Sequence, residues 1–175
     1  MSRVCVLQTL GLVIILTGSP ISASEVITAN GTTTISSTMI NGDPIIIGIS
    51  SMMLDTNYPY KGAFMWGGDM KGDGSIRLPK TVIASMSVRI GKRNIIVPLS
   101  AYSDLGDPRR ISLDVIPQGS MLTIWGGEDE MGRTSRAYKV VLEYSYEGIL
   151  SRKVYFSLNP SEVWDETIYH RDWND

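Results

Sequence analysis

The stretch "RAYKVVLEYSYEGILSRKVYFSL", residues 136–158, decides the fold class. Apolar or aromatic residues alternate with polar ones across Tyr138–Tyr146, which is the period of a half-buried β-strand. The Glu147-Gly148 dipeptide can form a tight turn, after which the alternation returns. The two segments therefore predict a β-hairpin. Arg152 is an exception, because it occupies a position on the otherwise apolar face of the second strand.

The same alternation recurs along the rest of the chain. "VIASMSVRI", residues 82–90, predicts a strand, and Gly91-Lys92 suits a hairpin turn into "RNIIVPLS". "RISLDVI" and "MLTIW" read as strands joined by "PQGS". Roughly nine to eleven short strands with frequent turn signals predict an all-β protein, a single antiparallel β-sandwich of Ig-like or related type with little helix. The apolar face of the 82–90 strand is expected to carry Val82, Ala84, Met86, Val88 and Ile90.

The first and last parts of the chain are less regular. Asn30-Gly31 favours a hairpin turn between "EVIT" and "TTTIS", although "NGT" also matches the N-glycosylation pattern. "PIIIGIS", residues 44–50, reads as an apolar strand that could pair at an exposed sheet edge. The C-terminal "NPSEVWDETIYH" fits either a short helix capped by Ser161 or an extended segment.

The N-terminus has the layout of a secretory signal peptide. Arg3 precedes an apolar stretch from Leu10 to Leu16, and the small residues Ser22–Ser24 follow Pro20. The stretch is short of the roughly 20 residues that span a bilayer. We therefore predict a signal peptide over residues 1–24, cleaved after Ala23 or Ser24, and a β-sandwich domain over residues 25–175. No membrane span is expected after cleavage, and the localisation is expected to be periplasmic or secreted.

Cleavage would remove Arg3 and Cys5, which is the one cysteine of the chain. The 16 basic residues fall to 15 against 18 acidic ones, so the formal charge becomes −3. A mature chain without cysteine has no thiolate metal ligand, no cysteine nucleophile and no disulfide. This composition suits a bacterial exported protein. A mildly acidic chain without a basic tract makes nucleic acid an unexpected partner.

Two loops repeat one pattern: "MWGGDMKGDGS" at 65–75 and "IWGGEDEMG" at 124–132. Each places a tryptophan before two glycines and acidic residues. A calcium loop would need oxygen ligands at alternating positions, and Lys71 breaks the EF-hand pattern. We expect turns, with no metal and no cofactor. Trp66 and Trp125 are candidate ligand-binding residues if the loops meet at one end of the sandwich to form an aromatic platform; core packing of both rings is the alternative.

The loop "SAYSDLGDPRR", residues 100–110, joins two predicted strands and gathers polar and aromatic groups. Binding residues concentrate on such loops of rigid scaffolds. Tyr102, Asp104 and Arg109 are therefore candidate ligand-binding residues. The structural alternative is a turn begun by Asp107-Pro108, with Asp104 bonded to nearby backbone amides and an arginine paired with a carboxylate.

Few catalytic arrangements are compatible with the sequence. His170 is the one histidine, and it has neither a nucleophile-elbow partner nor further histidines to bind zinc. No phosphate-binding glycine loop or dinucleotide fingerprint occurs. A carboxylate pair that cleaves glycosides leaves no sequence signature, so that chemistry stays open. We assign no catalytic residue and expect the protein not to be an enzyme.

Three segments carry a family resemblance: "VPLSAYSDLGDPRRISL", "YKVVLEYSYEGILSRKVYF" and "EVWDETIYH". Together they cover roughly the last half of the chain, which resembles exported bacterial β-rich proteins of unassigned function. The resemblance implies export from a bacterium and assigns no site residue.

These observations lead to three functional hypotheses. The first is a non-catalytic β-sandwich that binds another envelope or secreted protein, or a glycan, for example as an inhibitor or immunity-type protein. The second is a structural or accessory subunit of an envelope assembly. The third is a carboxylate-based hydrolase.

Overall fold

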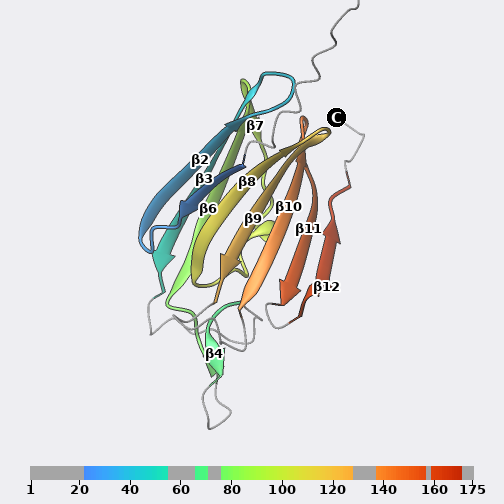
Figure 1. Cartoon of the computed structure of the whole chain (residues 1–175). Helices are drawn as coiled ribbons and strands as arrows, with labels where there is room; N and C mark the ends of the chain where they lie inside the picture. Colours follow the sequence, from blue (N-terminus) through green and yellow to red (C-terminus); the bar gives the residue numbers. More distant parts are fainter. Residues whose placement is uncertain (1–21, 55–65, 71–75, 128–136, 157–158, 171–175) are drawn as a thin grey trace, which may run out of the picture.

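The computed structural model describes residues 22–54, 66–70, 76–127, 137–156 and 159–170. Two antiparallel sheets pack face to face (Figure 1). In the described residues the larger sheet has the strand order β1 (Ser22–Val26), β8 (Pro108–Ile116), β9 (Gly119–Gly126), β10 (Tyr138–Ser145), β11 (Ile149–Phe156) and β12 (Asn159–Ile168). The smaller sheet has the order β2 (Gly31–Thr38), β3 (Pro44–Met53), β6 (Thr81–Ile90) and β7 (Arg93–Ile95).

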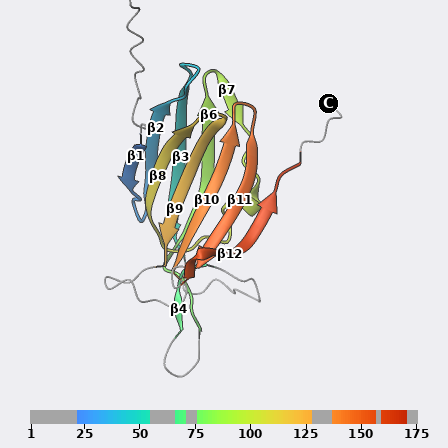
Figure 2. The same ribbon diagram turned by 45° about the vertical axis from the view of Figure 1, so that its right-hand side comes forward.

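Two minor elements complete the described structure. A hairpin of β4 (Asp69–Met70) and β5 (Ile76–Arg77) lies at one end of the sandwich (Figure 2). A single turn of 3-10 helix, η1 (Leu99–Ala101), is the one helical element of the described residues. No helix among the described residues is long and apolar enough to cross a membrane. The predicted all-β sandwich with little helix is therefore confirmed.

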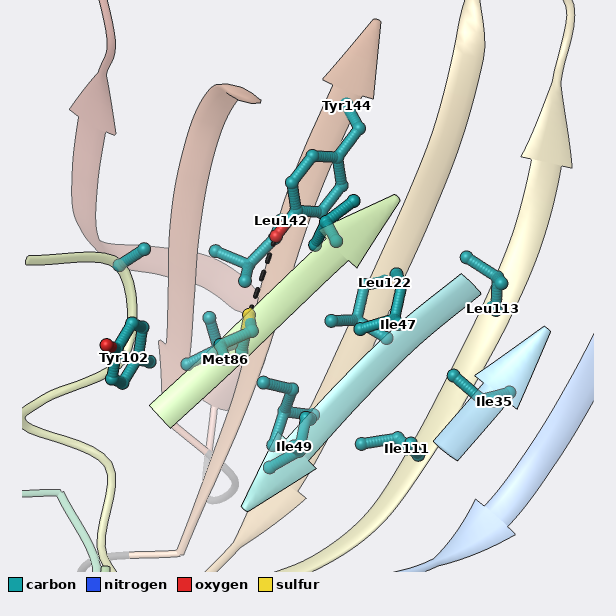
Figure 3. Packing of buried hydrophobic residues seen from close by; sticks show 14 of the residues in the cluster. Ile35, Ile47, Ile49, Met86, Tyr102, Ile111, Leu113, Leu122, Leu142 and Tyr144 are labelled. Atoms are coloured by element: carbon teal, nitrogen blue, oxygen red, sulfur yellow. Dashed lines mark hydrogen bonds between the residues drawn. The ribbon is translucent and has the colours of Figure 1, made fainter. Parts of the chain in front are cut away.

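The core lies between the sheets, and the period-two pattern of the sequence places its residues there. The inward positions of β10 are all fully buried, as are those of β3 that face the larger sheet. Figure 3 shows Ile47, Ile49, Leu142 and Tyr144 in the space between the sheets, and the Tyr144 hydroxyl lies 3.6 Å from the sulfur of Met86 on the opposite sheet. Each buried large apolar side chain contributes about 1.5–3 kcal/mol. The inward residues of these strands are Ile45, Ile47, Ile49, Tyr138, Val140, Leu142 and Tyr144.

The predicted hairpins around the core are confirmed. β6 and β7 are joined by Gly91-Lys92, with Gly91 at a φ of 57° that favours glycine. β8 pairs with β9 across Pro117-Gln118, and β10 pairs with β11 across the Glu147-Gly148 turn. A register shift in the last hairpin leaves Leu150 exposed, so this residue departs from the apolar phase of β11.

The hairpin expected at Asn30-Gly31 is wrong. β1 pairs with β8 in the larger sheet, whereas β2 pairs with β3 in the smaller one. The turn instead carries the chain from one sheet to the other, with Gly31 at a φ of 147°. An Asn-Gly pair predicts a turn, but it does not predict which strand the following segment pairs with.

The expected face of β6 is also partly wrong. Ser85 pairs with Ser50 and Ile83 with Ser51, so Ala84 is an extra residue in a β-bulge. Ala84 is consequently exposed, and Ile83 joins the core. The alternation holds as predicted only for the residues after the bulge.

Two further expectations concern strand positions. The "PIIIGIS" segment begins β3, which lies between β2 and β6 and has no free edge in the described structure. The idea that this segment pairs with a partner is therefore wrong. The C-terminal segment forms β12 with Ser161 inside the strand, so the extended alternative holds and the helix does not.

The predicted signal cleavage falls within β1. This strand contributes five register pairs to β8, from Ser22 with Asp114 to Val26 with Arg110. Cleavage after Ala23 or Ser24 would remove the first two or three of them. The export signal itself remains a prediction.

Candidate functional site

The loop between η1 and β8 is held by backbone contacts and by one aspartate. The Asp107 carboxylate accepts hydrogen bonds from the Thr81 amide and hydroxyl and from the Lys80 amide, at 2.8–3.3 Å. Asp107 has a φ of 46°, a left-handed conformation that aspartate tolerates better than most residues. The expectation that Asp104 bonds to backbone amides is therefore wrong, because Asp107 makes these contacts in its place.

Replacing Asp107 by alanine is expected to lower the free energy of unfolding by about 2 kcal/mol, because it leaves the Lys80 and Thr81 amides without their acceptor. Asp107→Asn should cost less, since asparagine keeps one carbonyl oxygen and tolerates the same φ. Urea denaturation of both variants measures the difference. An alanine variant as stable as wild type would contradict this role.

Tyr102 lies in the same loop and is buried, with 6% of its surface exposed. Its ring packs with the hydrophobic cluster between the sheets (Figure 3). Burial of this kind supports the loop and leaves little of the side chain for a partner to contact.

Asp104 pairs with a buried arginine. Arg152 of β11 is 3% exposed and pairs in register with Leu142, so it points into the sandwich. One terminal nitrogen lies 2.6 Å from the Asp104 carboxylate and the other 2.7 Å from the carboxylate of Asp165 on β12. The guanidinium therefore ties β11, β12 and the loop together.

This buried network is not completely paired. In the described structure, the second carboxylate oxygen of Asp104 and the Nε of Arg152 are buried without a hydrogen-bond partner. Burial raises the pKa of Asp104 above its usual 3.8, and the Arg152 guanidinium offsets part of that rise. At pH values between its unfolded and folded pKa, Asp104 is therefore protonated in the folded protein and ionised in the unfolded chain.

The sign of the resulting pH dependence follows from proton linkage. Because the folded pKa is raised, the contribution of Asp104 to the free energy of unfolding decreases as the pH rises from 3.8 through the folded pKa. Asp104→Asn should remove this component. Urea denaturation of both proteins at pH values across this interval tests it. A difference between them that does not fall with rising pH would contradict the assignment.

Trp66 belongs to a second set of contacts beside this network. It is 4% exposed, its amide donates to the Asp104 carbonyl at 2.8 Å, and its ring centroid lies 6.4 Å from that of Tyr138. Trp164 on β12 meets the Trp66 ring edge-on at 6.5 Å. The Tyr138 hydroxyl donates to the Gly106 carbonyl at 3.0 Å, and burial raises the pKa of this phenol. Trp66 is thus part of the protein interior.

Trp125 lies on the opposite face of the larger sheet. Its neighbours along β9, Ile124 and Gly126, are buried and inward, whereas Trp125 is partly exposed. Trp66 and Trp125 therefore do not form a common aromatic platform. Gly67, Gly68 and Gly127 all have positive φ angles, which supports the turn interpretation of both tryptophan-glycine motifs.

Strand register places Trp125 in a row across the outer face. Arg110 pairs with Trp125, Trp125 with Lys139, and Lys139 with Tyr155. We call these four residues the cation–aromatic row. The Arg110 guanidinium carbon lies 4.2 Å from the centroid of the Trp125 ring, and the Lys139 ammonium lies 4.1 Å from that of Tyr155. Each cation is thereby held over an aromatic face.

The two cations of the row have no acidic partner in the part of the chain that the structure describes. Lys153, on the same face but outside the row, pairs with Glu166 at 3.6 Å. Arg109 is exposed and is the extra residue at the register shift between Pro108 and Arg110. The row therefore offers unpaired positive charge on a protein whose formal charge is −2.

The opposite end of this face is acidic. Asp114 and Glu143 belong to one register row, through Met121, that lies four residues from the cation–aromatic row along each strand. Four residues of strand correspond to about 13 Å. Positive and negative ends are thus separated on one sheet face.

The structure brings together only some of the residues expected from the sequence. Buried Trp66 and half-buried Asp104 are joined by a backbone hydrogen bond, while Arg109 and Trp125 both neighbour Arg110 on the outer face. Whether Tyr102, Asp104, Arg109, Trp66 and Trp125 bind a ligand stays a prediction. The sequence analysis did not identify Lys139 and Tyr155 as candidates. The alternation in the hairpin of β10 and β11 places both residues on its outer face, which is the one indication the sequence contains.

The acidic loops after the tryptophan-glycine motifs lie largely outside the described residues. Among the side chains that the structure describes, no three histidine, cysteine or acidic residues are grouped so that they could hold a metal ion. No family model, curated protein or solved structure matches the chain. The fold and the local chemistry therefore carry the functional argument.

Proposed function

We propose that this is an exported, non-catalytic β-sandwich protein that acts by binding a protein or a glycan in the bacterial envelope. Export rests on the signal-like N-terminus, and the periplasm or the extracellular space is the corresponding location. The observation that carries the binding role is the cation–aromatic row, where Arg110 and Lys139 are held over Trp125 and Tyr155 and have no acidic partner among the described residues.

The physical reason is that ordered, unpaired charge on a rigid sheet favours association. A flexible surface cation loses side-chain entropy when it binds, and stacking on a ring reduces that loss. An inhibitor or immunity-type protein and a glycan-binding protein both fit this description. Asp114 and Glu143 at the other end of the face would help to orient a partner.

The test is capture of partners by the purified exported protein. Immobilised wild-type protein is exposed to envelope protein fractions and to a glycan array, beside an Arg110→Gln/Lys139→Gln variant. We expect a partner that wild type retains and the variant loses. Arg109→Ala is a useful third protein, whereas Tyr102→Ala would disturb the core. Absence of a partner from both panels would contradict the proposal.

A second candidate function is an accessory subunit that assembles through β12. This strand ends the larger sheet as described and carries three exposed apolar side chains, Val163, Trp164 and Ile168. An unpaired edge of this kind can accept a strand from another chain. Concentration-dependent assembly that Trp164→Lys abolishes would favour this candidate.

The described residues give little support to a carboxylate-based hydrolase. Among the described residues, Asp104 and Asp165 are an acidic pair that shares one partner, Arg152. One oxygen of Asp104 pairs with Arg152 and the other is buried, so neither is free to reach a substrate.

A further inference from the structure

We propose that the cation–aromatic row binds an acidic polysaccharide, with two carboxylates of one chain of uronate-type sugars on Arg110 and Lys139. This inference rests on the proposed binding function and specifies its ligand. The first argument concerns the N–H donors of Arg110 and Lys139 that stacking on the rings leaves free. A guanidinium that stacks through its face keeps its N–H groups directed outward around its edge, and an ammonium over a ring keeps donors on the opposite side.

The spacing of the cations suits an extended polymer. Arg110 is on β8 and Lys139 on β10, so one strand separates them in the register row. Neighbouring strands lie about 4.8 Å apart, which places the two backbone positions roughly 10 Å from each other. Two anionic groups on one chain that lies across the strands can meet both cations at once.

The charge distribution favours a polymer that lies across the strands over one that runs along them. A polyanion that followed the strands would pass from the row towards Asp114 and Glu143, where it would meet like charge. Lying across the strands, it stays on the row and can reach exposed Arg109 near its end. The acidic end of the face thus sets the orientation of the ligand.

An acidic protein fits the row less well than a polysaccharide does. A stable protein interface buries about 800 Å² on each partner around an apolar, often aromatic, centre. Here one cation lies over the Trp125 ring and another over the Tyr155 ring, so the row presents charge at its aromatic residues. A flexible glycan needs only shallow polar contacts and gains affinity by repeating them.

The experiment measures binding of oligogalacturonate to the full exported protein by calorimetry at low salt. Neutral dextran and polyglutamate serve as comparison ligands. Arg110→Gln/Lys139→Gln removes both cations, and Arg89→Gln/Lys153→Gln removes two positive charges outside the row. Arg89 is on β6 of the other sheet, and Lys153 is on the same face as the row. Matched thermal unfolding shows that the variants are folded.

We expect wild type and the control variant to bind oligogalacturonate equally. The row variant should bind about 100-fold more weakly, since each charge-assisted hydrogen bond is worth about tenfold. The single Lys139→Gln variant should lie between them, and added salt should weaken binding.

Three results would overturn the inference. Equal weakening in the row and control variants would show a non-specific charge effect. Equal or tighter binding of polyglutamate through the row would assign it to an acidic protein. Absence of oligogalacturonate binding, while a partner is captured in the envelope or array panels, would reject this ligand and leave the proposed function standing.

Discussion

Arg152→Ala is expected to lower the free energy of unfolding by about 3 kcal/mol, the lower end of the range for removing one member of a buried ion pair. The arginine is 3% exposed, and its loss leaves the carboxylates of Asp104 and Asp165 without their shared partner. It also disconnects the edge strand β12 from the loop that carries Asp104. Urea denaturation of wild type and variant, fitted with one common dependence of the free energy of unfolding on urea concentration, measures the change.

The adjacent residue provides a matched control. Lys153 pairs with Glu166 on the same two strands, but 31% of the lysine side chain and 46% of the glutamate side chain are exposed. Lys153→Ala should therefore cost less than about 1 kcal/mol. Adding Asp104→Asn to Arg152→Ala should recover part of the loss, because it removes an unpaired charge on a side chain that is only 30% exposed. Equal costs for Arg152→Ala and Lys153→Ala would contradict the buried network.

Gly119→Ala is expected to destabilise the protein by about 3 kcal/mol or more. A β-carbon at this position would overlap the carbonyl oxygen of Tyr144 and lie 3.0 Å from the Cα of Ser145, both on the neighbouring strand β10. Backbone cannot yield as a flexible side chain does, so the pairing of β9 with β10 must shift. Thermal and urea unfolding report the loss.

Gly148→Ala is the control for this substitution. Gly148 also lies at a hairpin end of the larger sheet, and a β-carbon there would meet nothing within 4 Å. The change should stay within about 0.5 kcal/mol of wild type. A Gly119→Ala protein as stable as Gly148→Ala would show that the β9–β10 contact is looser than the structure indicates.

Alternation of apolar residues was sufficient to predict the sandwich and its clearest hairpins. β10 has four inward residues that are fully buried, and its alternation is uninterrupted. The same reasoning failed at Ala84, because a bulge adds one residue there. Strict alternation across the bulge therefore assigns the residues before it to the wrong face of the sheet. It failed at Asn30-Gly31 because a turn does not specify which sheet receives the next strand.

The candidate site was less accessible from the sequence than the fold. Arg152 could be identified as anomalous, since it is a charged residue on an apolar face, but its partners come from a loop 48 residues away and from an edge strand 13 residues away. Lys139 and Tyr155 could be assigned to an outer face. Their alignment with Arg110 and Trp125 depends on the register of four strands, which local patterns do not determine.

The most direct test of the binding role follows the tryptophan indole N–H resonances in an NMR titration with oligogalacturonate. Trp125→Phe assigns the signal of the row, and Trp66 serves as an internal reference because it is buried on the other side of the sheet. The row predicts that the Trp125 resonance shifts on titration, while that of Trp66 stays in place. A Trp125 resonance unmoved by the ligand, with binding detected by calorimetry, would place the site elsewhere and contradict this account.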